Sequence, residues 1–540
     1  MPHSISRRAV HAQRHPERPA PAPDGARRLL PRLQPGGVDH CQGADHPAHA
    51  ADPSGSGDGH AGVAGAEGPS TDALCRLVHL SSGRLRAVQP GRGLPAGLGP
   101  AAARPPGARP EIGTFSWLAM MFCAGIGIGI LVFSVSEPVS DFLTNPDTLS
   151  GALPAAQAET LPSAMRFVFF HWGLSAWSSY VMVGLALGLA CHRNGHPLTM
   201  RSGLEPLVGK RLEGRLGDMI DVLAILATVS GIATTIVLGL EHICAGLSEL
   251  TGAAFFADQA GNPPLVALLT ALVLAIAATI ASIVSGMERG VKWTSHCGIA
   301  LAFLVLAVFV IFGGGTQVVR VFVESVLRYV ATLPVQMVTI YDPVQDSARH
   351  AWQGDWTIFY WAWWVAFAPF VGLFLVRISR GRTVRQFILG AMLGPSLMCF
   401  AWFSGTGGSA LLMEIDGRAG GSILQAEHAY RIVAAVNVML GPTGATLMTA
   451  VLTLLFLVLI MASSTAAIIA IKSIGSAGSP QGETPLHSML WAVAIAALTG
   501  AIITAGGIGA IRDAMLVMTL PFSVVLAGMF LAVLRQLTRG

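Results

Sequence analysis

Aromatic side chains at one helical spacing are the residues of this sequence best suited to specific chemistry. On a helix, Trp356, Tyr360, Trp363, Trp364 and Phe367 fall at intervals that place their rings on one face. A quaternary ammonium group cannot donate strong hydrogen bonds, and each ring face attracts it by about 0.5–2 kcal/mol. The spacing therefore predicts an aromatic cage for a quaternary-ammonium solute.

Depth in a membrane separates these rings into two groups. Tryptophan and tyrosine gather at membrane interfaces, which accounts for Trp356 and extends to Tyr360 and Trp361. At about 1.5 Å per residue, Trp363 and Phe367 lie roughly 10–17 Å deeper than Trp356. An interfacial belt does not explain aromatic residues at that depth, whereas a cage or simple filling of the core does.

A second group of aromatic residues is expected at the same depth. Trp172, Trp177 and Tyr180 stand in the middle of an apolar stretch that runs from residue 165 to 190. Acidic residues are scarce inside the apolar stretches, although a primary ammonium substrate would more readily require one. This scarcity agrees with ring faces as the binding groups.

The composition requires a membrane around these residues. The chain has 540 residues, of which 52% are hydrophobic and 12% charged, and its mean hydropathy is +0.59. The net charge of +4 belongs to connections between apolar stretches, so no nucleic-acid partner is expected. The seven cysteines are scattered, which indicates packing thiols. Without a nucleophile–base pair or a metal-ligand cluster, an enzyme is not expected.

Ten apolar stretches are long enough to cross a bilayer, which needs about 20 residues. They are 115–138, 165–190, 218–247, 264–285, 296–313, 356–378, 386–409, 440–472, 486–505 and 512–535. Between the fifth and sixth, residues 316–345 mix charges with apolar residues, which predicts an amphipathic helix at the interface. The fold class is an all-α polytopic membrane protein.

Basic residues predict the orientation, because they concentrate in cytoplasmic connections. They follow the second, fourth and sixth spans, with Lys472 and Arg535 continuing the alternation. The connection after the first span holds Glu137, Asp141 and Asp147 and no basic residue, so it is expected outside. Both termini are then cytoplasmic.

Ten spans divide into two sets of five, and a duplicated set of five must enter the membrane in the opposite sense. The sequence thus predicts a 5+5 inverted repeat, with repeat one at about 115–313 and repeat two at about 356–535. The first span of each set is expected to be interrupted. In the sixth span, the interruption is expected near Ala366, Ala368 and Pro369.

Glycines interrupt the first span. Gly125, Gly127 and Gly129 lie in the segment GIGIG. Glycines inside a span free backbone groups that water, ions or a substrate then satisfy. The alternative is close helix packing, because Gly125 and Gly129 are four residues apart. Both interpretations stay open at this point.

Residues 1–111 differ from the transporter domain expected over 112–540. Up to about residue 110 this segment contains no Phe, Trp, Tyr, Lys or Asn and is rich in Pro, Gly, Ala and Arg, so it cannot build a core. A disordered tail is one interpretation. The other is translation of a GC-rich gene in the wrong frame.

Several segments resemble one family, the betaine/carnitine/choline transporters. DWTIFYWAWW at 355–364 is close to its signature, and FHWGLSAWSSY at 170–180, CAGIGIGI at 123–130 and VRISRGRTVRQF at 376–387 are similar to its recurrent segments. The resemblance implies a LeuT-like inverted-repeat core. It also implies a bacterial cytoplasmic membrane location and a homotrimer, with no cofactor apart from a coupling sodium ion or proton.

The resemblance also assigns site residues. The expected cage is Trp172, Trp177, Tyr180, Trp363, Trp364 and Phe367, the last of these at a position usually held by Trp or Tyr. The segment with Gly125, Gly127 and Gly129 resembles that of betaine- and choline-type members.

The expected ion sites depart from the family pattern. Thr228 and Ser463 match hydroxyl ligands, but Ile232 and Ala462 stand where a second hydroxyl would be at each site. Glu241 is a candidate proton carrier, or else a residue near a helix end that faces water. The residues expected to handle the coupling ion are Ile126, Thr228, Ser463 and Glu241.

The predicted function is uptake of a quaternary-ammonium compatible solute, such as glycine betaine or choline, by alternating access. The alternative is a truncated membrane protein that does not transport, or a solute sensor. The expected partners are the small solute and membrane lipid.

Overall fold

The computed structural model describes residues 110–114, 117–118, 120–121, 127–285, 292–476 and 485–539. Nearly all of the expected amino-terminal segment 1–111 lies outside these residues, as do Gly125 and Ile126. The expected first span, 115–138, is described only in part.

Every regular element of the described chain is helical. The longer helices are α3 (Ile128–Leu143), α5 (Leu161–Trp172), α6 (Leu174–Gly188), α8 (Arg215–Thr251), α9 (Leu265–Val284), α10 (Lys292–Val308), α11 (Gln317–Gln336), α13 (Phe359–Ile378), α14 (Val384–Phe403), α15 (Ser409–Ile415), α17 (Arg431–Met439), α18 (Pro442–Gly475) and α19 (Pro485–Arg539). Shorter elements include α4 (Pro146–Leu149), α7 (Glu205–Val208), α12 (Ser347–Trp352) and α16 (Ser422–Gln425).

The chain is a multi-pass membrane protein. Within the described residues, nine helical segments are long and apolar enough to cross a bilayer. They are Ala158–Arg193, Arg215–Thr251, Leu265–Val284, Trp293–Gly314, Ser347–Ile378, Val384–Ile415, Pro442–Gly475, Pro485–Ala505 and Arg512–Thr538. These nine segments correspond to the second to tenth expected spans.

The first helix extends further than the sequence predicts. We expected Glu137 and Asp141 in an external connection, but α3 continues to Leu143 and both acidic residues are buried. Pro138 lies inside the helix and cannot donate a hydrogen bond to the carbonyl four residues earlier. The Thr406 hydroxyl lies 3.1 Å from that carbonyl of Ser134 and shares its proton between it and the Trp402 carbonyl, 2.8 Å away. A neighbouring helix thus stabilises the extension.

The expected break in the sixth span is wrong. Helix α13 is continuous from Phe359 to Ile378 and contains Pro369 in its interior. The second span of each set is irregular instead. In set one, Gly173 separates α5 from α6, and in set two a wide turn, Ser404–Gly408, joins α14 to α15.

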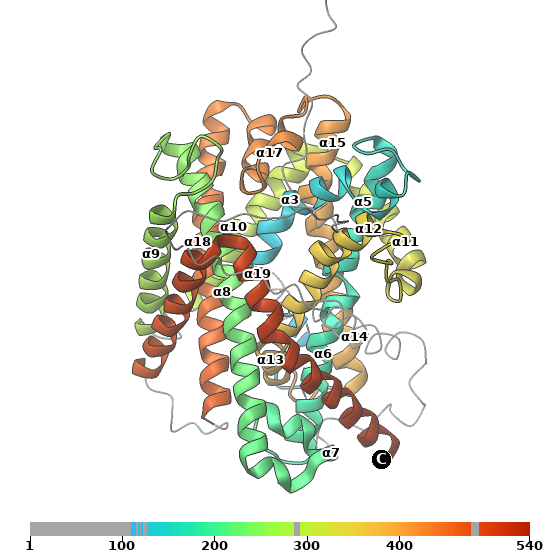
Figure 1. Ribbon diagram of the computed structural model, residues 1–540, viewed down its shortest axis with the longest axis vertical. Coiled ribbons are helices and arrows are strands. Elements are labelled where there is room, and N and C mark those ends of the chain that lie inside the picture. The colour runs from blue at the N-terminus through green and yellow to red at the C-terminus, as the bar shows by residue number, and fades with distance from the viewer. Residues whose placement is uncertain are drawn as a thin grey trace, which may run out of the picture. The chain divides into compact units, whose positions relative to one another are not determined.

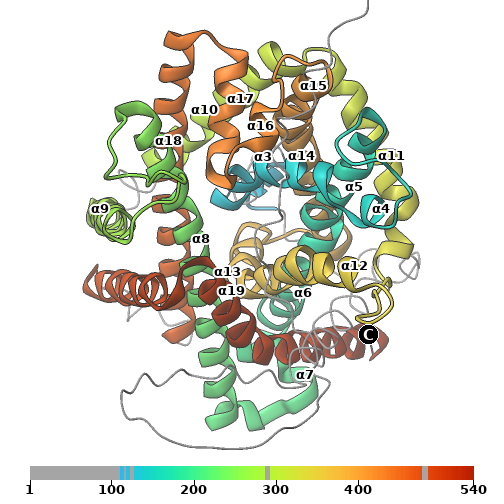
Figure 2. The same cartoon turned by 45° about the horizontal axis from the view of Figure 1, so that its top comes forward.

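Helix contacts follow the two sets of five. The long third helices of the two sets, α8 and α18, pack against each other, and both views show them side by side (Figure 1 and Figure 2). The first helix of each set contacts the third helix of the other set: α3 contacts α18, and α13 contacts α8. The helix with the fifth span of each set does the same: α10 contacts α18, and α19 contacts α8. Each contact recurs with the sets exchanged, as a 5+5 repeat requires.

The last two expected spans form one continuous helix, α19. Figure 1 shows its two legs meeting at a sharp bend, so the chain turns from one leg into the other without a separate loop. At the start of the second leg, Arg512 Nη1 lies 2.7 Å from Asp355 Oδ1. This ion pair links α19 to the segment that precedes α13.

Helix α11 lies within residues 316–345, where the sequence predicts an amphipathic helix, and it has three different faces. Tyr329 is buried against the protein, while Val319 and Leu327 are each 65% exposed on an apolar face. On the third face, Arg320 pairs with Glu324 at 2.7 Å. The three faces suit protein, lipid and water, respectively.

Candidate functional site

One cavity of about 410 Å³ collects the predicted aromatic residues from both sets of helices. Its wall contains all six: Trp172, Trp177, Tyr180, Trp363, Trp364 and Phe367. Helices α5 and α6 supply the first three and α13 the others, while α3, α8, α10, α14 and α18 complete the wall. The interface between the two sets therefore forms this site.

Trp364 lies at the centre of the ring cluster. Its ring centroid is 4.9 Å from that of Trp172, 5.6 Å from that of Trp363 and 6.2 Å from that of Tyr180. The Trp363 and Trp364 planes are parallel to within 1°, whereas Trp172 and Tyr180 stand almost perpendicular to Trp364. Ring faces consequently point in several directions, as enclosure of a diffuse cation requires.

Protein acceptors hold the indole N–H groups of three of the four tryptophans of the cage. Trp363 Nε1 donates to the Thr235 hydroxyl at 3.1 Å, and Trp364 Nε1 donates to the His171 carbonyl at 2.9 Å. Trp172 Nε1 donates to Glu137 Oε2 at 2.7 Å. The rings are fixed in orientation, and their faces, not their N–H groups, remain for a ligand.

The two described glycines of the GIGIG segment have different roles. A Cβ at Gly129 would lie 2.8 Å from Trp363 Cη2 and 3.2 Å from Trp172 Cη2, so two cage rings occupy the space of its missing side chain. A Cβ at Gly127 meets no atom within 4 Å, and Gly127 lines the cavity. The structure thus favours cage access over helix packing at both positions.

The cavity wall carries little charge. Among its described residues there is no Asp or Glu, and the one charged side chain is Arg377, whose Nη2 donates to the Ser473 hydroxyl at 2.7 Å. Helix α3 begins at the wall, with Gly127 in an extended conformation before it. A helix N-terminus favours negative charge. The cage and this N-terminus together suit a ligand with a cationic head and an anionic tail.

An aromatic cluster around Phe133 lies beside the Trp363 end of the cavity, which is opposite Arg377 along α13. Phe133 packs against Tyr360, Trp363 and His428, with ring centroids 5.4–5.8 Å away. Burial, followed by the neighbouring His242 and Arg431, lowers the pKa of His428 to about 3. His428 is therefore neutral at pH 7 and packs as an aromatic ring.

The interfacial interpretation fails for Tyr360 and Trp361. Both side chains are buried, and Trp361 packs edge-on against Phe170 at 5.1 Å. The Tyr360 hydroxyl donates to Glu137 Oε2. Trp356 is half-buried and stacks on Tyr360, with centroids 6.3 Å apart. Tyr360 thus belongs to the support of the cage.

A buried polar cluster beside the cage was not foreseen from the sequence. Ligand atoms of Glu137, Asp141 and His171 lie within 4.8 Å of one another, and all three side chains are buried. His171 Nδ1 is 2.7 Å from Glu137 Oε1, and His171 Nε2 is 3.1 Å from the Thr357 hydroxyl. The spacing of Glu137 and Asp141, four residues apart, was the one available signal, because it places both on one helix face.

The described residues of the predicted ion sites have different surroundings. Ile126 lies outside the described residues. The Thr228 hydroxyl donates to the Ala224 carbonyl of its own helix at 2.8 Å, while Ser463 lines the cavity. Glu241 is buried in α8, so it does not face bulk water. Thr228 and Ser463 are too few oxygen ligands for a sodium site, and these residues do not fit one.

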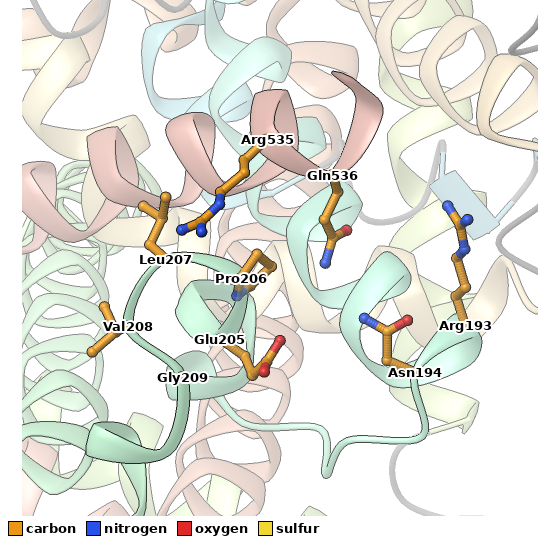
Figure 3. Close-up of a pocket in the computed structure, with 9 residues that line it drawn as sticks. All are labelled: Arg193, Asn194, Glu205, Pro206, Leu207, Val208, Gly209, Arg535 and Gln536. Carbon is orange, nitrogen blue, oxygen red and sulfur yellow. The ribbon is translucent and has the colours of Figure 1, made fainter. Parts of the chain in front are cut away.

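A second cavity, of about 540 Å³, lies apart from the cage (Figure 3). It is formed by the end of α19 with Arg535 and Gln536, the segment after α6 with Arg193 and Asn194, and residues 205–209. Its wall contains none of the predicted site residues and combines two arginines with one glutamate. The second cavity is therefore not the site that the sequence predicts.

Comparison with known proteins identifies one family. The profile described as "BCCT, betaine/carnitine/choline family transporter" matches residues 104–540. This range includes every predicted site residue.

Similar transporters occur in several bacteria. An uncharacterised transporter of Mycobacterium bovis is 37% identical over 425 residues, covering 77% of this chain and 68% of that protein. The glycine betaine transporter OpuD of Bacillus subtilis is 32% identical and covers 80% of this chain and 81% of its own length. The high-affinity choline transport protein of Escherichia coli is 36% identical, and the match covers 78% of this chain and 60% of that protein.

Proposed function

This chain belongs to the betaine/carnitine/choline transporter family, and from that premise we propose that it is a secondary active transporter that takes up glycine betaine by alternating access. Choline is the second candidate substrate. Both carry the trimethylammonium group that an aromatic cage recognises.

The cage is the observation that carries the proposal. Six aromatic side chains from both helix sets line one cavity, and hydrogen bonds to the protein fix the three indoles of Trp172, Trp363 and Trp364. Filling of the core would not require ring faces to border a cavity of about 410 Å³. A cage that binds by ring faces also needs no carboxylate, in agreement with the described wall.

Glycine betaine fits the charges of the cavity better than choline does. Betaine has a carboxylate, and both Arg377 and the N-terminus of α3 at Gly127 favour negative charge. Choline has a net positive charge and offers these groups only a neutral hydroxyl. Half-helix N-termini hold anionic substrate groups in other inverted-repeat transporters.

Alternating access is supported by where the cavity ends. The aromatic cluster around Phe133 packs beside its Trp363 end, and it extends to Arg377, near the end of α13, on the other side. By the positive-inside rule, the Arg377 end is cytoplasmic. The described conformation is then inward-facing.

We place the protein in the bacterial cytoplasmic membrane as a homotrimer, with both termini inside.

Uptake tests the proposal directly. Radiolabelled betaine and choline are offered to bacteria that lack their own carriers, and we expect accumulation of betaine, with weaker uptake of choline. Trp364→Ala should strongly reduce uptake at low betaine concentration without changing the amount in the membrane. Trp293→Ala is the matched control, because Trp293 is 73% exposed and does not line the cavity.

The same assay decides against transport if it fails. A well-inserted wild-type protein that accumulates neither solute would favour a solute sensor. Unchanged uptake by Trp364→Ala would remove that residue from the binding site.

A further inference from the structure

The buried cluster of Glu137, Asp141 and His171 concerns the ion that drives transport. Its interpretation rests on the proposed function. Glu137 already accepts three hydrogen bonds, from Trp172, Tyr360 and His171. Its two oxygens are thereby satisfied, and one of these donors belongs to the cage. A change of charge in the cluster therefore acts on Glu137, the carboxylate that positions Trp172.

Asp141 is the unsatisfied member. Its side chain is 0% exposed, and neither carboxylate oxygen has a hydrogen-bond partner. The buried indole N–H of Trp352 faces the Asp141 carboxylate but makes no hydrogen bond of normal geometry with it, and the Trp352 ring lies 5.7 Å from that of His171. A buried ionised carboxylate without partners, beside a second carboxylate, is strongly unfavourable. Asp141 therefore needs a cation or a proton.

The ligand count favours a proton over a metal ion. Glu137 is occupied by its three donors, and His171 Nδ1 and Nε2 face Glu137 and Thr357. Only the Asp141 oxygens are free, and one carboxylate is too small a ligand set for a buried metal ion. A proton needs just one such oxygen.

The surrounding charged and titratable groups leave Asp141 without a counter-ion. From α17, Arg431 Nη1 donates to the Ser136 carbonyl at 2.8 Å and to the Ser140 hydroxyl at 2.6 Å, so it binds α3 and not the carboxylates. Arg166 pairs with Asp147 and not with Asp141, with Arg166 Nη2 2.7 Å from Asp147 Oδ2. The remaining neighbours are Tyr360 on α13 and, beyond Phe133, the imidazoles of His428 and His242.

We propose that Asp141, together with Glu137 and His171, forms an exchangeable proton site that couples proton entry to transport of the substrate. Binding of a proton at an Asp141 oxygen removes one buried negative charge next to Glu137. Glu137 carries this change to the cage through its hydrogen bonds with Trp172 and Tyr360. The coupling ion is thus a proton, held outside the cavity.

The full chain in liposomes with glycine betaine provides the test. With sodium absent and one pH unit across the membrane, acid outside, the wild type should accumulate betaine up to about tenfold, because one pH unit is a tenfold difference in proton activity. A pH-sensitive dye should record proton entry with betaine. Asp141→Asn should lose both, and Asp141→Glu should recover part of each.

Controls separate coupling from folding and from the proposed function. Betaine–betaine exchange moves no net proton and reports whether Asp141→Asn is folded. Asp147→Asn, an acid-to-amide change outside the cluster, should accumulate betaine as the wild type does. If Asp141→Asn loses exchange as well, the dye measurement on the wild type and on Asp141→Glu decides.

Each contrary result has its own meaning. Accumulation that follows a sodium gradient and ignores the pH gradient overturns the proton site, as does full coupling in Asp141→Asn. Loss of coupling in Glu241→Gln with full coupling in Asp141→Asn assigns the proton to Glu241 instead. A wild type without betaine exchange overturns the transport function itself, and this inference with it.

Discussion

At the scale of single residues, the shape of the site depends on the missing side chain of Gly129 as well as on the aromatic rings. Trp172 and Trp363 approach α3 because residue 129 is a glycine. The cage has its shape only while these rings keep their places. Substitutions at Gly129 and at Gly127, which faces open space, should consequently differ in effect.

Gly129→Ala tests this difference. A methyl group 2.8 Å from Trp363 Cη2 must displace a fixed ring, at a cost of about 1–3 kcal/mol, or roughly 5- to 150-fold in the betaine Kd. Gly127→Ala meets no atom within 4 Å and should weaken binding much less. Titration of tryptophan fluorescence with betaine measures both Kd values. Equal Kd values for the two variants would contradict the assigned role of Gly129.

At the scale of helices, the cage depends on close contact between α6 and α13, because each carries part of it. A Cβ at Gly372 of α13 would lie 2.6 Å from Val183 Cγ1 and 3.2 Å from the Gly184 nitrogen of α6. Small residues at such contacts let membrane helices pack closely. The distance between Tyr180 and Trp364 therefore depends on Gly372.

Gly372→Val should push the two helices apart. Overpacking of this kind costs about 1–3 kcal/mol, so we expect a lower thermal midpoint and weaker betaine binding together. Gly188→Val, on α6 where no atom lies within 4 Å, is the control and should leave both unchanged. A normal midpoint for Gly372→Val would mean that α6 and α13 are not held by this contact.

Sequence patterns predicted most helices because membrane spans are long and apolar, and they predicted α11 because its charges recur on one face. They predicted the cage residues because aromatic rings at mid-depth are unusual. The continuity of α13 through Pro369 was not predicted, and neither was the extension of α3 past Pro138, which involves a partner in a distant segment, Thr406. For the same reason, the partners of Glu137 could not be found from the sequence.

At the scale of the whole molecule, transport requires the cavity to face one side of the membrane at a time. Ser295 of α10 lines the cavity with Arg377, on the side expected to be cytoplasmic. The loop between α8 and α9, which contains the exposed Asn262, is expected outside.

Accessibility of introduced cysteines tests this arrangement. In a background without native cysteines, Ser295→Cys should react with a membrane-impermeant thiol reagent added from the cytoplasmic side, and betaine should slow the reaction. Asn262→Cys should react from outside only and be insensitive to betaine. Labelling of Ser295→Cys from outside alone would reverse the assigned orientation of the cavity.

The central claim is that ring faces bind a quaternary ammonium group, and a neutral isostere tests it most directly. Glycine betaine and 3,3-dimethylbutyrate have the same shape and carboxylate, but only betaine carries the positive nitrogen. Two cage rings at about 1 kcal/mol each predict that betaine binds roughly 30-fold more tightly to the wild type. In Trp364→Ala this ratio should fall several-fold. Equal affinity of the wild type for the two compounds would contradict the account.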